Sequence, residues 1–77
     1  MAEYVLYSKE TCPYCQKVLR FMASRNINMP VKNTLDPAIR QELVEIGGKG
    51  QVPCLVIDGK ALYESDDIIS YLQENLA

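Results

Sequence analysis

The order of apolar and polar positions along the chain predicts short strands alternating with helices. Apolar-rich runs of strand length are separated by longer stretches in which apolar residues recur every three or four positions, as on one face of a helix. Pro30 limits its run to an edge strand at best, and Asp58-Gly59 is typical of a two-residue hairpin turn. The expected order is strand 3–7, helix 13–25, edge strand 27–33, helix 37–47, strands 52–57 and 61–63, and helix 65–76.

Individual residues indicate where these helices begin and end. Thr11 is a candidate N-cap of the first helix, Asp36 precedes a proline that suits the first turn of the second, and Ser65 is expected to cap the third. Gly47-Gly48 should end the second helix, because glycine accepts the left-handed conformation. The inner faces are expected to contain Val18, Leu19 and Met22; Ile39, Leu43 and Ile46; and Ile68, Ile69, Leu72 and Leu76.

Composition and charge narrow the class of protein. The 77 residues contain 8 Lys and Arg against 10 Asp and Glu, a net charge of −2, which is too weak a bias to indicate nucleic acid or an anionic membrane as a partner. No long apolar run or charged leader is present in the sequence. We therefore expect one soluble domain over residues 1–77, monomeric and cytoplasmic, with no nucleic-acid or membrane partner.

Cys12-Pro13-Tyr14-Cys15 is the motif that carries chemistry. It lies where the first strand pattern gives way to the first helix pattern, and a helix N-terminus favours an anion such as a thiolate. Cys15 follows one turn later, close enough to form a disulfide with Cys12. A zinc site usually needs four ligands, and this chain has no histidine and one further cysteine, so thiol redox chemistry is favoured and no metal is expected. Cys54 is expected to be a buried small apolar residue, the alternative being a regulatory thiol.

The order of elements, with this motif at the first strand-to-helix turn, resembles the glutaredoxins over most of the chain. Two further pieces support the resemblance: Val52-Pro53, where the family carries a cis-proline, and Ser65-Asp66-Asp67 at the start of the last helix. The resemblance implies an α/β thioredoxin-like fold of βαβαββα order, with a four-stranded mixed sheet flanked by three helices.

The same resemblance implies a glutathione site, position by position. Lys9 would face the glycine carboxylate and the Cys12 thiolate, and Tyr14 would pack along the tripeptide. Val52 would offer backbone groups to the cysteinyl part, while Ser65 and Asp66 would receive the γ-glutamyl end. The full set implied for glutathione is Lys9, Tyr14, Arg40, Gln51, Val52, Pro53, Ser65 and Asp66.

Two positions depart from the glutaredoxin pattern. Gln51 stands where the family usually has threonine, and Tyr63-Glu64 stands where it often has two glycines. Glu64-Ser65 is more similar to the glutathione-binding edge of glutathione transferase N-terminal domains. Both families hold glutathione there, so the departures affect affinity and partner choice and leave the ligand class unchanged.

The activity implied is that of a dithiol glutaredoxin. Cys12 would be the nucleophile and Cys15 the resolving thiol in reducing protein disulfides and protein–glutathione mixed disulfides, with glutathione as the co-substrate. Two alternatives stay open. The chain could be a redoxin supplied by thioredoxin reductase, or a carrier that holds an iron–sulfur cluster through Cys12 and external thiols.

Overall fold

The computed structural model describes residues 3–76, which form a four-stranded mixed sheet with helices on both faces. The strands are β1 (Tyr4–Ser8), β2 (Val31–Asn33), β3 (Cys54–Ile57) and β4 (Lys60–Tyr63), in the order β2-β1-β3-β4. β1 runs parallel to β2 and antiparallel to β3, and β3 pairs antiparallel with β4. The predicted order of elements and the thioredoxin-like α/β fold are confirmed.

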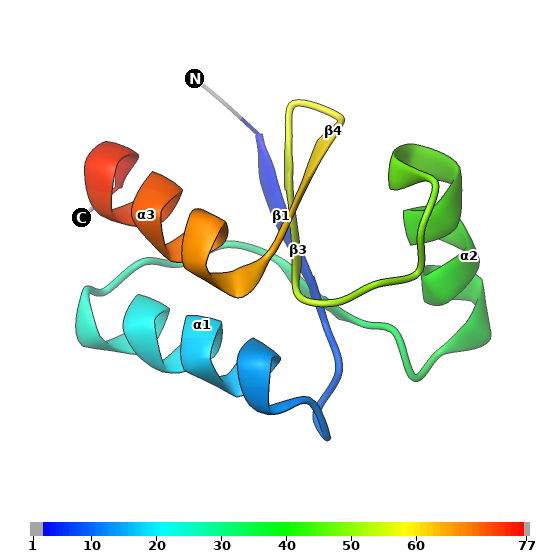
Figure 1. The fold of residues 1–77 in the computed structure, drawn as a ribbon, viewed down its shortest axis with the longest axis horizontal. Helices are drawn as coiled ribbons and strands as arrows, with labels where there is room; N and C mark the ends of the chain where they lie inside the picture. Colours follow the sequence, from blue (N-terminus) through cyan, green and yellow to red (C-terminus); the bar gives the residue numbers. More distant parts are fainter. Residues whose placement is uncertain (1–2, 77) are drawn as a thin grey trace.

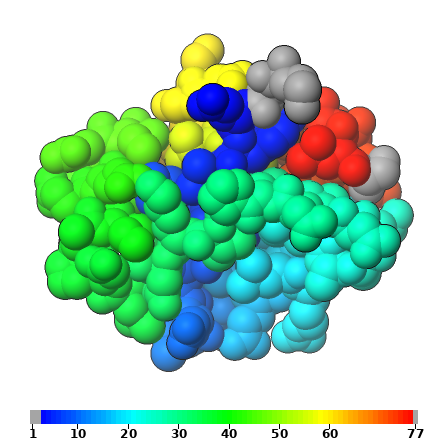
Figure 2. All heavy atoms as spheres, turned by 180° about the vertical axis from the view of Figure 1, so that it is seen from behind, coloured from blue at the N-terminus to red at the C-terminus, as the bar shows by residue number. Residues whose placement is uncertain are grey.

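Three helices cover the sheet. α1 (Pro13–Ser24) and α3 (Ser65–Asn75) lie side by side on one face, and α2 (Pro37–Gly47) lies alone on the other (Figure 1). From behind, the segment between α1 and α2, which contains β2, crosses the surface between those helices (Figure 2). β2 is therefore an edge strand, as the proline in its run predicted.

The core is divided by the sheet into two clusters. Successive side chains of a strand point to opposite faces, so Leu6 and Leu55 pack with α1 and α3, while Tyr7 and Cys54 pack on the side of α2. This explains why the central strands read as continuous apolar runs. The first cluster contains Leu6, Val18, Met22, Ile27, Leu55, Ile68 and Leu72; the second contains Tyr7, Leu43, Cys54 and Val56.

The turn between β3 and β4 forms as predicted, but two helix caps do not. Asp58 and Gly59 have φ of 50° and 82°, the positive values that a tight hairpin turn requires. Thr11 is not the cap of α1: the amide of Cys12 bonds to the carbonyl of Lys9, so the turn closes one residue later and Cys12 is the N-cap. Ser65 is already the first residue of α3, with Glu64 at the N-cap.

Two residues predicted for the inner faces are exposed. Ile46 lies in the last turn of α2 and Leu76 follows the end of α3, and each is 38% exposed. Both keep the helical spacing of the buried residues before them, but at the end of α2 it is Gly47 that lies against β4, next to Ala61 and Tyr63. The predicted strand 52–57 also begins later, at Cys54, since Pro53 has no N–H for the ladder.

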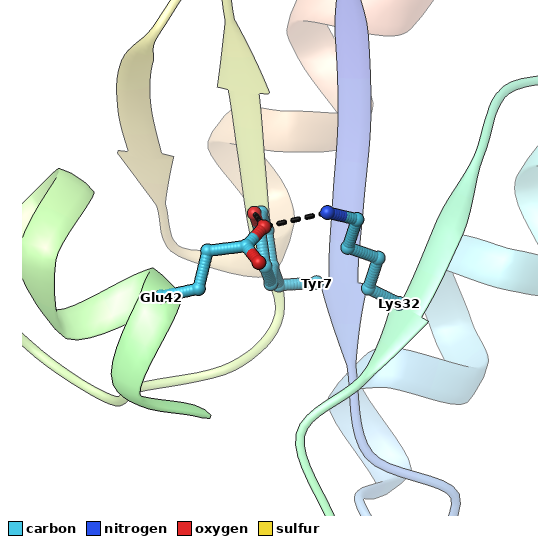
Figure 3. A network of polar contacts seen from close by, with 3 residues as sticks. All are labelled: Tyr7, Lys32 and Glu42. Atoms are coloured by element: carbon cyan, nitrogen blue, oxygen red, sulfur yellow. Dashed lines mark hydrogen bonds and ion pairs between the residues drawn. The ribbon is translucent and has the colours of Figure 1, made fainter. Parts of the chain in front are cut away.

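A polar network joins α2 to the sheet at β1 and β2 (Figure 3). The hydroxyl of buried Tyr7 donates to Glu42 on α2, and the ammonium of Lys32 on β2 lies 2.6 Å from the same carboxylate. Burial and then the Glu42 carboxylate raise the pKa of Tyr7 to about 12. The hydrogen bonds from Lys32 and Tyr7 lower the pKa of Glu42. The network keeps a buried phenol satisfied and fixes the position of α2.

We expect Gly47→Ala to destabilise the fold, although alanine normally favours a helix. A Cβ at Gly47 would lie 2.8 Å from Cβ of Ala61 and 2.9 Å from Cζ of Tyr63, closer still to the tyrosine hydroxyl. Overpacking of this kind costs about 1–3 kcal/mol, measurable as a lower urea midpoint. In a Tyr63→Phe background the loss should shrink, and an equal loss in both backgrounds would contradict the steric explanation.

Candidate functional site

The two cysteines of the motif occupy different environments. Cys12 is the N-cap of α1 and partly exposed, whereas Cys15 lies in the first turn and is fully buried. The carbonyl of Cys12 accepts the amide of Gln16, and the amide of Lys9 points at the sulfur of Cys15 at 3.4 Å. The loop from β1 thus places one thiol at the surface and the other beneath it.

Opposing effects act on the pKa of Cys12, and the net result is a lowered value. Partial burial raises the pKa, but hydrogen bonds from the backbone and thiol of Cys15 and from the backbone of Tyr14, together with the charge of Lys9, outweigh it. The backbone donors, from Tyr14 and Cys15, belong to the helix N-terminus, where N–H groups have no partner within the helix. Cys12 therefore has the stronger tendency to be a thiolate at neutral pH.

The pKa of Cys15 moves in the opposite direction, to about 11. Burial is the main cause; the hydrogen bond and the charge of Cys12 add to it, while the amide of Lys9 partly opposes it. At neutral pH the pair therefore consists of a partly exposed sulfur that tends to be a thiolate, Cys12, and a buried thiol that can donate to it, Cys15.

The split pKa values predict a pH profile for alkylation. Iodoacetamide reacts with thiolates, so the fast phase should modify Cys12, with a midpoint below the pKa of an ordinary free cysteine. Below that midpoint the rate should fall tenfold per pH unit, because the thiolate fraction falls. Lys9→Met should move the midpoint upward, since it removes a charge that favours the thiolate. A fast phase located by mass spectrometry at Cys15 or Cys54 would contradict this assignment.

A groove of about 310 Å³ begins beside Cys12. Its walls come from three places: the first turn of α1, the loop before β3, and the start of α3. The thiol of Cys12 lies 3.9 Å from the carbonyl oxygen of Val52, so this sulfur is at the edge of the groove. The Val52-Pro53 peptide bond is cis, as the resemblance implied. The lining residues are Tyr14, Gln51, Val52, Pro53, Glu64, Ser65 and Asp66.

Polar contacts join the parts of the groove wall. The amide of Gln51 lies 3.5 Å from the Glu64 carboxylate, so side chains from the loop and from the N-cap of α3 meet. The ammonium of Lys17, on α1, lies 2.7 Å from Oδ1 of Asp66, on α3. Glu64 holds φ at 74°, a conformation in which glycine is more usual, and this turns the chain from β4 into α3.

The structure brings together six of the eight positions implied for glutathione: Tyr14, Gln51, Val52, Pro53, Ser65 and Asp66. Lys9 and Arg40 are not among the lining residues. Lys9 acts on Cys12 through its charge, and the guanidinium of Arg40 lies against Gly50, just before the groove loop. Two relevant residues were not identified as site residues from the sequence. Glu64 was noted in the sequence as a departure from the family pattern, and the structure shows that it lines the groove. Lys17 was not noted, because no pattern in the sequence indicates its contact with Asp66 on α3.

Cys54 is buried on the opposite side of the sheet from α1. Its register neighbours are Tyr7 on β1 and Tyr63 on β4, and burial raises its pKa to about 11. The prediction of a small buried residue is confirmed. Within residues 3–76, His, Cys, Asp and Glu form no group of three or more suited to holding a metal. The helices of this same part of the chain are too short or too polar to cross a membrane.

Known sequences similar to this chain include glutaredoxins. Glutaredoxin 3 of Escherichia coli is 31% identical over 71 residues, covering 88% of this chain and 83% of that protein. The chain belongs to the glutaredoxin family. A second relative of this glutaredoxin is an uncharacterised glutaredoxin-like 8.6 kDa protein in the rubredoxin operon of Clostridium pasteurianum. It is 33% identical over 58 residues, and the match covers 74% of this chain and 77% of that protein.

The similarity of this glutaredoxin to glutathione transferases is also confirmed. The family model described as the glutathione S-transferase N-terminal domain matches residues 6–77. Among solved structures, oxidised glutaredoxin 2 of Chlamydomonas reinhardtii is 27% identical with a TM-score of 0.69, covering 95% of this chain and 73% of that one. Glutathione transferase Omega 3C of Trametes versicolor is 30% identical with a TM-score of 0.81, but the match covers 94% of this chain and only 33% of the transferase.

Proposed function

We propose that this protein is a glutathione-dependent thiol–disulfide oxidoreductase that reduces protein–glutathione mixed disulfides and protein disulfides. Family membership supports thiol–disulfide chemistry in general. The observation that carries the finer proposal is the position of Cys12: a sulfur with a lowered pKa at the edge of a groove of about 310 Å³.

In the proposed first step, the Cys12 thiolate attacks the glutathione sulfur of a mixed disulfide. A new S–S bond forms between Cys12 and glutathione, the old S–S bond breaks, and the protein substrate leaves as a thiolate that takes a proton from water. A second glutathione attacks the bound glutathione sulfur, which releases oxidised glutathione and restores the Cys12 thiolate. The net reaction consumes one reduced glutathione, and the other half of the oxidised glutathione comes from the mixed disulfide itself.

The groove offers the groups that hold the tripeptide in place. Val52 presents backbone groups beside Cys12, where the cysteinyl part of an extended peptide can pair as an added strand does. Ser65 and Asp66 lie at the N-terminus of α3, where a carboxylate is favoured by the unpaired N–H groups and an ammonium by the acid. Tyr14, which is 64% exposed, provides an aromatic face along the groove.

The test compares two electron supplies on one glutathionylated peptide. One reaction contains glutathione, glutathione reductase and NADPH; the other contains thioredoxin reductase and NADPH. We expect rapid NADPH loss in the first reaction only. Reduction of the protein in the second reaction only would replace this proposal with a redoxin supplied by thioredoxin reductase.

A further inference from the structure

Lys17 is a basic residue on α1 whose side chain reaches the part of the groove wall formed by α3. Its ammonium lies 2.7 Å from Oδ1 of Asp66, and Asp66 lines the groove. Lys17 is three residues after Tyr14 on α1, so the two side chains share one side of the helix. α1 and α3 lie side by side (Figure 1), which brings a residue from the second turn of one helix to the first turn of the other.

The charge of the groove wall explains why such a cation matters. Among residues 3–76 the lining side chains include two carboxylates, Glu64 and Asp66, and no basic group. Asp67 adds a further acid in the first turn of α3. Glutathione has a carboxylate at each end, with an ammonium beside the one on the γ-glutamyl residue. These acids suit the ammonium but repel the adjacent carboxylate, and the N–H groups of α3 must offset that repulsion.

We propose that Lys17 is a specificity-determining residue that binds the α-carboxylate of the γ-glutamyl group while Asp66 binds its ammonium. A carboxylate has about four acceptor sites, so Asp66 can accept the ligand ammonium at one oxygen while its other oxygen keeps the bond to Lys17. The positive charge of Lys17 then faces the ligand carboxylate, and the negative charge of Asp66 faces the ligand ammonium. This inference rests on the proposed function and adds a residue to that site.

The side chains are free to make this adjustment. Lys17 is 55% exposed and Asp66 is 83% exposed, so neither is locked by packing. A lysine ammonium has three donors, and one of them is used by Asp66. Lys17 can therefore bind the ligand carboxylate without losing its hydrogen bond to Asp66. The class of ligand that this pair selects has a zwitterionic amino-acid group at one end.

The test measures single transfers to the reduced enzyme, which avoids the second glutathione. Peptide mixed disulfides are prepared with glutathione and with an analogue in which 4-aminobutyryl replaces the γ-glutamyl group and so lacks only the α-carboxylate. Release of the peptide thiol gives a second-order rate constant for wild type, Lys17→Met, Lys17→Arg and Lys60→Met. Lys60, at the start of β4, is the control for loss of one positive charge.

We expect Lys17→Met to slow transfer from the glutathione disulfide about threefold to tenfold, the size of one charge-assisted hydrogen bond at a partly exposed site. Transfer from the analogue should be unchanged, Lys17→Arg should retain most of the preference for glutathione, and Lys60→Met should behave as wild type. The inference would be overturned if Lys17→Met lost equally on both disulfides, lost on neither, or transferred faster from the glutathione disulfide. Each of these outcomes would leave the proposed function intact. A wild-type enzyme that took no glutathionyl group would overturn the proposed function itself.

Discussion

Cys12→Ser is expected to abolish both the removal of glutathione from proteins and the reduction of protein disulfides. A serine hydroxyl is almost entirely protonated at neutral pH, so the donors that lower the pKa of Cys12 have no anion to stabilise. Loss of a nucleophile costs at least about a thousandfold in rate in covalent catalysts. The measurement is NADPH consumption with glutathione reductase, on a glutathionylated peptide and on a protein disulfide.

Cys54→Ala is the matched control for Cys12→Ser, since it also removes one sulfur. Cys54 packs against the α2 side of the sheet, away from the groove, so its loss should leave both rates within about twofold of wild type. It should still lower stability, because truncation leaves a small cavity in the core. Circular dichroism would establish that both variants are folded. An active Cys12→Ser variant, or an inactive but folded Cys54→Ala variant, would contradict the assignment of the nucleophile.

The sequence was sufficient to predict the order of elements because each is specified by local signals. Asp36 accepts the amide of Ala38 at the start of α2, and Gly48 ends that helix at φ 84°, both as predicted. Caps and turns of this kind depend on residues within one turn of each other. The N-caps of α1 and α3 lie one residue from the predicted Thr11 and Ser65, at Cys12 and Glu64, and neither of these side chains makes a capping hydrogen bond.

Burial at helix ends was less predictable, because it depends on which residue of the last turn faces the sheet. Ile46 and Leu76 continue the apolar spacing of α2 and α3 but are partly exposed, and in the last turn of α2 it is Gly47 that lies against β4. Periodicity identifies the side of a helix on which a residue lies. Periodicity contains no information about which residue of the last turn meets the opposing strand.

The groove could be predicted only where a motif pointed to it. Tyr14, Val52 and Ser65 come from three separated pieces of the chain whose common location was implied by family resemblance, and the fold brings them together. Lys17 and Asp66 are 49 residues apart, and their contact depends on how α1 lies against α3. No local pattern specifies that arrangement, so the partner of Lys17 had to be found in the structure.

Cys15→Ser is expected to separate the two reactions. Removal of glutathione needs only Cys12 and a second glutathione, so its rate should stay within a few-fold of wild type. Reduction of a protein disulfide leaves Cys12 joined to the substrate, and without Cys15 that intermediate waits for an external thiol. We expect the rate to fall about tenfold or more and the mixed disulfide to accumulate, visible as a heavier band on a non-reducing gel.

The environment of Cys15 explains why it would act second. Part of the rise of its pKa to about 11 comes from burial, and part from the hydrogen bond and negative charge of Cys12. Once Cys12 is in a disulfide, that charge is gone, while the amide of Lys9 still points at the Cys15 sulfur. The pKa of Cys15 should then fall, which makes it a better nucleophile only after Cys12 has reacted. If Cys15→Ser instead stopped the removal of glutathione, Cys12 would not complete that reaction alone, and the proposed order of the two thiols would be wrong.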